Sequence, residues 1–506
     1  MSVLSNINKT MRYMKRNGAR DAFSAAMERL ERNARTHYSY VSPDDGELAK
    51  QRKETSGSEG WPSITIVMPT YNTDEHFFRE ALSSVLKQSY PHWKLVIADA
   101  SDSDTVRRWA DKCASEPRIR YVELDSNRGI SGNTNAGIDA ALDDTSHGLC
   151  DYIAFMDHDD VLTPDALYHM AAAIRGGNPM LLYSDEDKMS EDSKRVISYF
   201  DPHRKYDFNY DLLMTNNYIC HLMVVRSDML KSIRVRSAYD GAQDYDLVLQ
   251  LVMSLIKDYG LQTYELGEYI VHVPRVLYHW RCHRDSTAAN TSSKEYAYEA
   301  GLRTVTDMVN ALYGREKYDD NGYPRVSHSK HRGFYEVDWG IAREGASSSG
   351  KHGSDEETSG GHASGRHVSG QRILNAHSSD ENGSDEQTLV GMTPDLKKFF
   401  NLRPDVGAVI GRVLDKRGRM TECIADKDGN WLYAGTPKNY SGELNRFDCN
   451  QDVYMADIQH VIVRPELTGL LKSSDTASGD SASASRAFAD ELRRRGYLIL
   501  YIPKLY

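Results

Sequence analysis

Residues 157–160, which read Asp-His-Asp-Asp, are the group whose residue types and spacing most directly suggest chemistry. They follow the short apolar run 152–156, which predicts a buried strand ending at a carboxylate cluster. Neighbouring carboxylates repel one another unless a cation joins them, and sites built from oxygen ligands suit Mg²⁺ or Mn²⁺. We therefore expect a divalent cation here, with an acidic turn that caps the next helix as the alternative.

Three other predicted strands also end in polar residues. These are Thr70, Tyr71 and Asn72 after the first strand, Asp99 after the second, and Asn127 and Arg128 after the third. Each loop taken alone could be an ordinary turn or cap. The first loop lacks both the G-x-G-x-x-G and the P-loop glycine patterns, which argues against a dinucleotide dehydrogenase or an NTPase.

The elements that must position these residues alternate between strand and helix from Ser63 onward. Strands are expected at 64–68, 94–98, 119–124, 152–156, 180–183, 222–225 and 276–280, and helices at 77–86, 105–114, 130–142, 166–174, 246–256 and 296–312. This succession predicts an α/β fold with a mostly parallel sheet and helices on both faces. Parallel strands place their carboxyl ends at one edge, so the polar loops should line one crevice.

Composition limits the other possibilities. A chain of 506 residues is too long for one core, so two domains and a linker are expected. The net charge of -11 argues against a general nucleic-acid binder. Six scattered cysteines without a C-x-x-C pair indicate reduced thiols of a cytoplasmic protein, and no apolar run is long enough to predict a transmembrane helix.

Four segments follow from these patterns. Residues 1–60 form a basic helical extension, 61–315 the main domain, 316–390 a flexible linker rich in Ser, Gly and His, and 391–506 a smaller C-terminal α+β region. The first 35 residues combine apolar residues at helical spacing with an excess of Lys and Arg. Such a helix can lie on an anionic membrane face, or it can pack on the protein's own surface.

Six ordered blocks of the chain resemble a known family. They are residues 65–101, 119–141, 152–168, 181–188, 241–251 and 276–288. Together they look like a family 2 glycosyltransferase with the GT-A fold (Rossmann-like), resembling bacterial enzymes that build O-antigen, rhamnan or other cell-surface polysaccharides. The C-terminal region resembles the latter half of a second transferase domain without a second active site.

This resemblance implies roles for individual residues. It places a metal ion, Mn²⁺ or Mg²⁺, on Asp157 and Asp159, with Asp159 as the more direct ligand and Asp157 also reaching the donor ribose. His279 matches a position that supplies a metal-binding histidine in some relatives, and a structural histidine is the alternative. The implied donor-binding residues are Thr70, Tyr71, Asn72, Asp99, Asn127, Arg128, Asn135, Asp157 and Arg281, with His283 as a further phosphate contact. Structural salt bridges are the alternative for Arg281 and His283.

Asp244 falls where the family has its catalytic aspartate, although Gln243 replaces the usual glutamate before it. An inverting transfer needs a base that takes the proton of the acceptor hydroxyl. Asp246 is a second candidate, but two positions along a helix it should face elsewhere. Asp244 could also simply cap the helix that follows. The resemblance assigns no clear role to the block 185–188, which could be a polar loop beside the acceptor.

The expected function is metal-dependent inverting transfer of a sugar from a UDP- or dTDP-sugar to a growing, lipid-linked surface glycan. The protein would then work in the cytoplasm, peripherally at the inner face of the plasma membrane. One rival is a non-catalytic glycan- or nucleotide-binding partner of a polysaccharide-assembly complex. Another is a sugar-nucleotide pyrophosphorylase, which would need a Gly-rich, basic first loop that residues 69–72 do not provide.

Overall fold

The computed structural model describes residues 38–56, 60–143, 150–193, 195–283, 293–314, 322–341, 393–471 and 480–505. The chain divides into two compact units, Met1–Val337 and Asp338–Tyr506. The predicted N-terminal helix and most of the predicted linker lie outside the described residues. Among the described residues, the structure contains no helix that is both long and apolar enough to cross a membrane.

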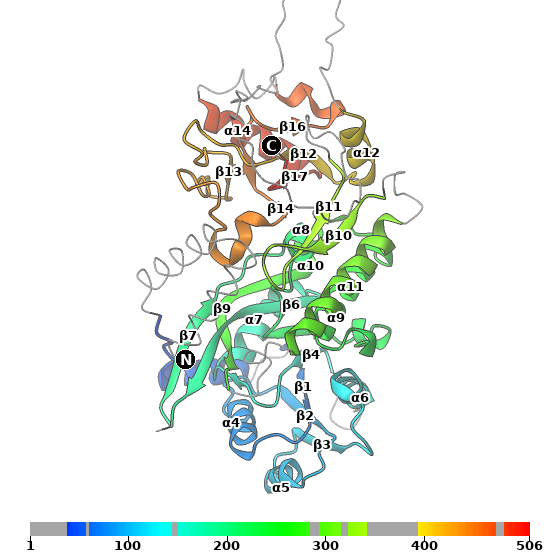
Figure 1. Ribbon diagram of the computed structural model, residues 1–506. Coiled ribbons are helices and arrows are strands. Elements are labelled where there is room, and N and C mark those ends of the chain that lie inside the picture. Colours follow the sequence, from blue (N-terminus) through cyan, green and yellow to red (C-terminus); the bar gives the residue numbers. More distant parts are fainter. Residues whose placement is uncertain are drawn as a thin grey trace, which may run out of the picture. The chain divides into compact units, whose positions relative to one another are not determined.

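The first unit is built on one mixed sheet (Figure 1). Its parallel half contains, in spatial order, β3 (Ile119–Glu123), β2 (Trp93–Asp99), β1 (Ile64–Thr70) and β4 (Tyr152–Phe155). The sheet continues through β8 (Met223–Arg226), β6 (Leu181–Glu191), β9 (Ile270–Arg281) and β5 (Val161–Leu162), and β7 (Ile197–His203) pairs with β6. The prediction of an α/β fold is therefore confirmed, and the carboxyl ends of the first four strands lie at one edge.

Helices cover both faces of this sheet. They are α4 (Glu75–Leu86), α5 (Thr105–Lys112), α6 (Gly129–Asp143), α7 (Ala166–Gly177), α9 (Gln243–Lys257) and α11 (Ser293–Tyr313). Ile66 and Met68 of β1 belong to the main core together with Phe78 of α4 and Leu167 of α7. The side chain of Val67 lies on the opposite face, towards α6. Because helices cover both faces, β1 is buried at every position although its side chains alternate between the two faces.

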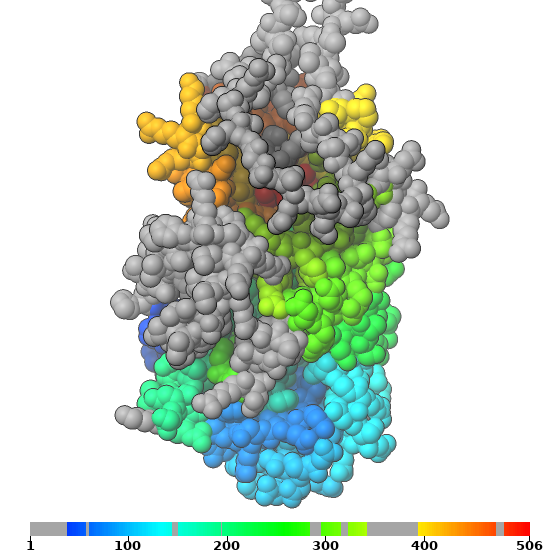
Figure 2. Space-filling model, viewed as in Figure 1, coloured from blue at the N-terminus to red at the C-terminus, as the bar shows by residue number. Residues whose placement is uncertain are grey.

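The chain from β1 to α6 occupies one end of the first unit, blue to cyan in Figures 1 and 2. This end contains the strands β1, β2 and β3 of the parallel half. The other end of the sheet is formed by later segments of the chain, drawn in green.

Strand β6 is longer than the sequence indicated. It continues from the apolar residues 181–183 through the polar block 185–191 and forms a hairpin with β7. The block 185–188 is therefore part of a strand and not a loop. Sequence periodicity missed this because charged neighbours, and not apolar burial, satisfy these side chains.

The first unit continues past residue 315, where the sequence placed its end. Strands β10 (Arg325–His328) and β11 (Tyr335–Asp338) pair with each other, and β10 packs against α11. The Tyr335 ring stacks on Tyr245 of α9 at 6.1 Å. This ring contact ties a segment of low apolar content to the main domain.

The second unit has its own small sheet, with strand order β14 (Gln451–Asp452), β17 (Leu498–Tyr501), β12 (Val406–Ile410) and β16 (Ile462–Val463). Strands β12 and β17 are parallel. Helix α14 (Ser481–Arg494) packs against β17, and α12 (Pro394–Leu402) precedes β12. The predicted α+β character of this region agrees with these elements.

The close packing of α6 on the sheet generates a testable prediction. A Cβ atom at Gly137 would lie 2.6 Å from Cγ1 of Val67. We expect Gly137→Val to lower the free energy of unfolding by about 1–3 kcal/mol, because the added methyl groups force β1 and α6 apart. Chemical denaturation measures this change.

Gly176 provides the matched control, since it also lies in a helix but no atom lies within 4 Å of a Cβ built there. Gly176→Val should change stability by about 0.5 kcal/mol or less. Equal losses for both variants would contradict the packing argument.

Candidate active site

The ends of β1 and β2 meet in a small hydrogen-bond network. Asp99 is buried, and its carboxylate accepts hydrogen bonds from the hydroxyls of Thr70 (2.8 Å) and Tyr121 (2.9 Å) and from the backbone N–H of Ser101 (3.0 Å). Burial and the neighbouring Asp99 raise the pKa of Tyr121, so its hydroxyl remains a donor. Asp99 is thus fixed by three hydrogen bonds at the carboxyl end of β2, the position that the sequence predicts.

Beside Asp99, Tyr71 and Asn72 of the first loop both contact Asp102, a residue that the sequence analysis did not single out. Asn72 lies in the left-handed region, with φ of 48°, and its amide donates to Asp102 (3.0 Å). The hydroxyl of Tyr71 donates to the same carboxylate (3.2 Å), and its ring is 42% exposed. An exposed tyrosine ring can stack on a nucleobase. The neighbouring amide of Asn72 and carboxylate of Asp102 can then pair with the edge of that base. Asp102 stands three positions after Asp99, which is the signal that could have found it.

The third loop has a partly structural role. The side-chain oxygen of Asn127 accepts from the backbone N–H of Gly129 (2.9 Å) and from the amide of Asn133 (3.0 Å), which fixes the start of α6. Arg128 is exposed, and no ion pair of its side chain is recorded within the described residues. Arg128 therefore remains free to meet a phosphate.

The predicted donor-binding role of Asn135 does not agree with its surroundings. Its amide donates to the carbonyl of Val235 (2.7 Å), and its oxygen accepts from the N–H of the same residue (3.1 Å). Both polar ends of the side chain are therefore used to fasten α6 to the segment before α9. We correct Asn135 to a structural residue.

The acidic turn after β4 contains three carboxylates with different environments. Asp157 is half-exposed, Asp159 is partly buried, and Asp160 is 1% exposed. Asp160 accepts from the hydroxyl of Tyr278 (2.6 Å) and from the backbone N–H of Arg281 (2.7 Å). Burial, together with the charges of Asp159 and Asp157, raises the pKa of Asp160 well above its usual value. Asp160 is thus held by two donors of the protein, whereas Asp157 and Asp159 are less buried.

Two histidines approach these carboxylates. Nε2 of His221 lies 3.7 Å from Oδ2 of Asp157, and Nε2 of His283 lies 3.0 Å from Oδ2 of Asp159. His221 also forms a group with Asp157 and Asp160 whose ligand atoms all lie within 4.8 Å of one another. Carboxylates combined with imidazoles fit Mn²⁺ and related cations, so the residues present fit the metal that the sequence predicts.

The groups around His221 shift its pKa in opposite directions. Burial lowers the pKa of His221, but Cys220, Asp157 and Glu186 raise it more, and the net result is well above its usual value. A histidine must lose its proton to ligate a cation, so these carboxylates oppose the binding of a metal by this ring.

The prediction that His279 is a metal ligand disagrees with the structure. Along β9, Tyr278 reaches the acidic turn while the adjacent His279 projects from the other face of the strand. His279 is 2% exposed, its Nδ1 lies 2.6 Å from Asp187, and its ring packs against Tyr40 and Tyr199. We correct the candidate histidines to His221 and His283.

Arg281 is also placed differently from the prediction of a donor contact. Its guanidinium is 2% exposed, donates to the backbone carbonyl of Asp159, and pairs with Glu80 of α4 at 2.7 Å. The ring of Phe77 lies beneath the guanidinium at 4.7 Å. Arg281 therefore supports the acidic turn through the backbone of Asp159, and its ion pair with Glu80 agrees with the structural salt bridge given as the alternative.

Asp244 lies in the first turn of α9 and is partly buried. Its carboxylate accepts a hydrogen bond from the amide of Asn217 (2.9 Å), whereas the side-chain oxygen of Asn217 is buried without a partner. Burial raises the pKa of Cys220 to about 12, and the nearby Asp244 contributes to this rise. The short segment 217–221 therefore connects the carboxylate of Asp244 to His221 and the acidic turn.

Asp246 is excluded as an alternative base by its contacts. It is fully buried and bound by Arg236, by Thr304 (2.8 Å) and by Gln250 (2.8 Å). Because Asp246 lies two positions after Asp244 in α9, the two side chains point to different sides of the helix, as predicted.

Strand β6 supports the site through Glu186. This buried carboxylate lies 3.2 Å from Nδ1 of His221 and 3.5 Å from Nζ of Lys205. Burial would raise the pKa of Glu186, but Lys205, His203 and His221 lower it well below the usual value. The ionised Glu186 therefore orients the ring of His221, a role that the sequence alone did not reveal.

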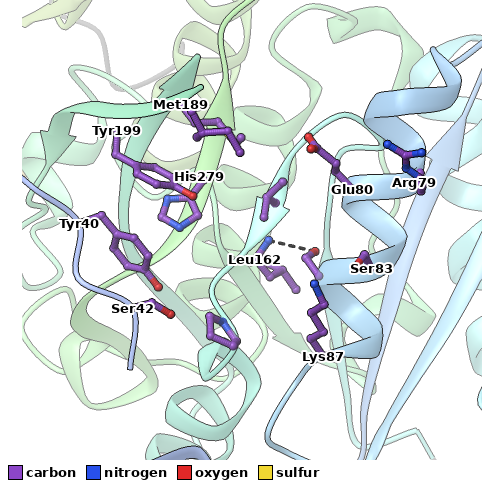
Figure 3. A pocket seen from close by; sticks show the side chains of 14 residues that line it. Tyr40, Ser42, Arg79, Glu80, Ser83, Lys87, Leu162, Met189, Tyr199 and His279 are labelled. Carbon is purple, nitrogen blue, oxygen red and sulfur yellow. Dashed lines mark hydrogen bonds between the residues drawn. The ribbon is translucent and has the colours of Figure 1, made fainter. Parts of the chain in front are cut away.

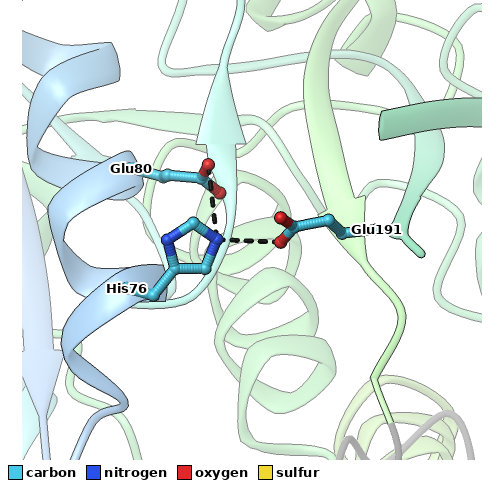
Figure 4. Close-up of side chains that lie close together, drawn as sticks. All are labelled: His76, Glu80 and Glu191. Carbon is cyan, nitrogen blue, oxygen red and sulfur yellow. Dashed lines mark hydrogen bonds and ion pairs between the residues drawn. The ribbon is translucent and has the colours of Figure 1, made fainter. Parts of the chain in front are cut away.

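A second cluster contains His76, Glu80 and Glu191 (Figure 4). Nε2 of His76 lies 2.8 Å from Glu191 and 3.6 Å from Glu80. Arg281 pairs with Glu80 and Arg195 with Glu191, so both carboxylates already have cationic partners. This cluster ties α4 to the end of β6 and does not need a metal.

Part of this chain is similar to known proteins. Residues 65–234 match the model of glycosyl transferase family 2. The uncharacterized protein y4gI of Sinorhizobium fredii is 34% identical over 278 residues, and the O-antigen biosynthesis protein RfbC of Myxococcus xanthus is 31% identical over 283. Each match covers 53% of this chain, but only 28% and 20% of those proteins. The chain thus spans less than a third of their length.

A shorter relative is matched over more of its length. It is the UDP-Glc:alpha-D-GlcNAc-diphosphoundecaprenol beta-1,3-glucosyltransferase WfgD of Escherichia coli, which is 26% identical over 40% of this chain and 74% of its own. The crystal structure of S. aureus TarS 1-349 in complex with UDP is 17% identical, covers 49% of this chain and 65% of its own, and has a TM-score of 0.35. This structural likeness supports no functional assignment.

Proposed function

Because residues 65–234 form a glycosyl transferase family 2 domain, we propose that this protein is a metal-dependent inverting glycosyltransferase. The donor is a UDP- or dTDP-sugar, and the acceptor is a growing, lipid-linked glycan of the cell surface. The protein then works at the cytoplasmic face of the membrane, where both substrates are available.

The names of two relatives support the classes of donor and acceptor. WfgD is named for a UDP-sugar donor and a diphosphoundecaprenol-linked acceptor, and RfbC for O-antigen biosynthesis. On the chain itself, Tyr71 and Asp99 offer the stacking ring and the acceptor oxygen that a uracil or thymine base requires. Neither group distinguishes the two bases, so the donor class stays at UDP- or dTDP-sugar.

The observation that carries the proposal is the link between Asp244 and the acidic turn. Asn217 binds Asp244 at one end of the segment 217–221, and His221 approaches Asp157 at the other end. A carboxylate that can take a proton is thereby linked, through one short segment of the chain, to the residues that can hold a cation. An inverting displacement needs these two groups on either side of the transferred sugar.

Each residue then has a defined part in the reaction. Asp157 and Asp159, with His221 or His283, would hold the cation, which supplies Lewis-acid stabilisation to the departing nucleoside diphosphate. Asp244 accepts the proton of the acceptor hydroxyl as its oxygen forms the new bond to the sugar. Asn217 donates to Asp244 and so fixes the direction in which the carboxylate points. Arg128 offers a positive charge to the phosphates.

Replacement of the proposed base provides the main test. We expect Asp244→Asn to lower the rate of sugar transfer by about 10²–10⁴, because the amide cannot accept the proton. Donor binding, measured by calorimetry with a UDP-sugar and Mn²⁺, should remain. Asp159→Ala should weaken both donor binding and transfer, and chelation of the metal should reproduce this result.

Asp258 offers a matched control, since it lies at the other end of α9 and is bound only locally by Ser254. Asp258→Asn should retain transfer. A wild-type protein that binds the donor but never releases UDP or dTDP would instead indicate the non-catalytic binding partner. Release of pyrophosphate from a nucleoside triphosphate would indicate a pyrophosphorylase.

Loss of the group that orients Asp244 should have a smaller effect of a distinct kind. A hydrogen bond to a charged group contributes about 1.5–3 kcal/mol, so we expect Asn217→Ala to lower kcat by about 10- to 100-fold. The KM for the donor should change little, because Asn217 holds the base and not the nucleotide. Steady-state kinetics separates the two parameters, and a rise in the donor KM at unchanged kcat would contradict this role.

A further inference from the structure

A cavity of about 650 Å³ lies on the other face of β9 from the acidic turn (Figure 3). It is bounded by α4, β5, the hairpin β6–β7 and the segment around Tyr40. His279, which the sequence analysis predicted as a metal ligand, lines this cavity and faces away from the acidic turn. The cavity is therefore separate from the crevice that we assign to the donor.

The two walls of the cavity differ in chemistry. One wall is apolar and aromatic, formed by Leu162, Met189 and Ile197 with the packed rings of Tyr40 and Tyr199. The centroids of the two tyrosine rings lie 5.1 Å apart. A ligand that fits this wall must have an apolar part.

The opposite wall is a polar stripe on α4. Arg79, Ser83 and Lys87 are spaced by four residues, so they lie on one face of the helix. Glu80 also lines the cavity, but its charge is balanced by Arg281 at 2.7 Å. Within the described part of the chain, no ion pair joins Arg79 or Lys87 to a carboxylate, and Arg79 contacts the ring of His76. The wall therefore carries two positive charges that a bound anion would meet.

Exposed aliphatic side chains occur on the segments that bound this cavity. In the described part of the first unit, five large aliphatic side chains are exposed, and the one away from the cavity is Ile130. The other four either line the cavity or are next in sequence to a residue that does: Val41 (82% exposed), Leu86 (39%), Val196 (57%) and Ile197 (39%). A local concentration of exposed apolar side chains indicates a surface with an apolar partner.

We propose that this cavity and its rim bind an anionic lipid of a membrane. The phosphate of the headgroup contacts Arg79 and Lys87, and the aliphatic rim enters the boundary between headgroups and acyl chains. Positive charge beside exposed aliphatic side chains is the combination that a negatively charged bilayer surface attracts. Arg281 connects α4 to the acidic turn, so the docked face is linked to the proposed catalytic site through this one residue.

The test uses the full chain and sedimentation with phosphatidylcholine vesicles, with and without phosphatidylglycerol. All variants keep the basic N-terminus, so a difference between them reports on the cavity. We expect the double variant Arg79→Glu/Lys87→Glu to bind anionic vesicles about tenfold or more weakly than the wild type. Val196→Ser/Ile197→Ser should weaken binding without a change of charge.

Matched controls remove equivalent groups elsewhere. Lys112→Glu/Lys257→Glu reverses two exposed lysines in the last turns of other helices, and Ile130→Ser replaces the exposed aliphatic residue outside the patch. These controls should bind vesicles within about twofold of the wild type. Thermal unfolding verifies that each variant is folded.

Three results would overturn the proposal. The first is unchanged vesicle binding by both cavity variants, and the second is equal loss in the charge controls, which would indicate unspecific attraction. The third is thermal stabilisation by inorganic phosphate that is lost in Arg79→Glu/Lys87→Glu while vesicle binding stays the same. That last pattern would assign the cavity to a small soluble anion.

Discussion

The constraint on which the site depends is the repulsion among the carboxylates that follow β4. Asp157, Asp159 and Asp160 lie within one turn, and such a group is stable only if other residues neutralise or share its charge. Tyr278 and the backbone of Arg281 bind Asp160, and two histidines approach the other two carboxylates. These partners come from segments distant in sequence, which the sheet brings together.

The same constraint explains why the support extends far behind the turn. Arg281 donates a hydrogen bond to the backbone carbonyl of Asp159 and forms an ion pair with Glu80 of α4. Glu186 of β6 holds the ring of His221. Polar side chains of β6, β9 and α4 thus support the acidic turn. Its position depends on these buried pairs as well as on apolar packing.

Much of this could be predicted from the sequence, and the failures have a common cause. The ends of parallel strands are fixed by local apolar runs, so Thr70, Asp99 and Asp157 could be placed at one edge. The direction of His279 could not be predicted, because it depends on how β9 pairs with β6 and β5. Asn135 carries the residue type of a ligand contact, yet a backbone partner a hundred positions away occupies it.

The most direct test of the central claim is the ligand set of the bound cation. Pulsed electron paramagnetic resonance on the Mn²⁺–UDP complex detects coupling to a histidine nitrogen. The account predicts this coupling in the wild type, its loss or reduction in His221→Ala or His283→Ala, and its retention in His279→Ala. Loss in His279→Ala alone, or full Mn²⁺ binding after Asp159→Ala, would contradict the site described for this protein.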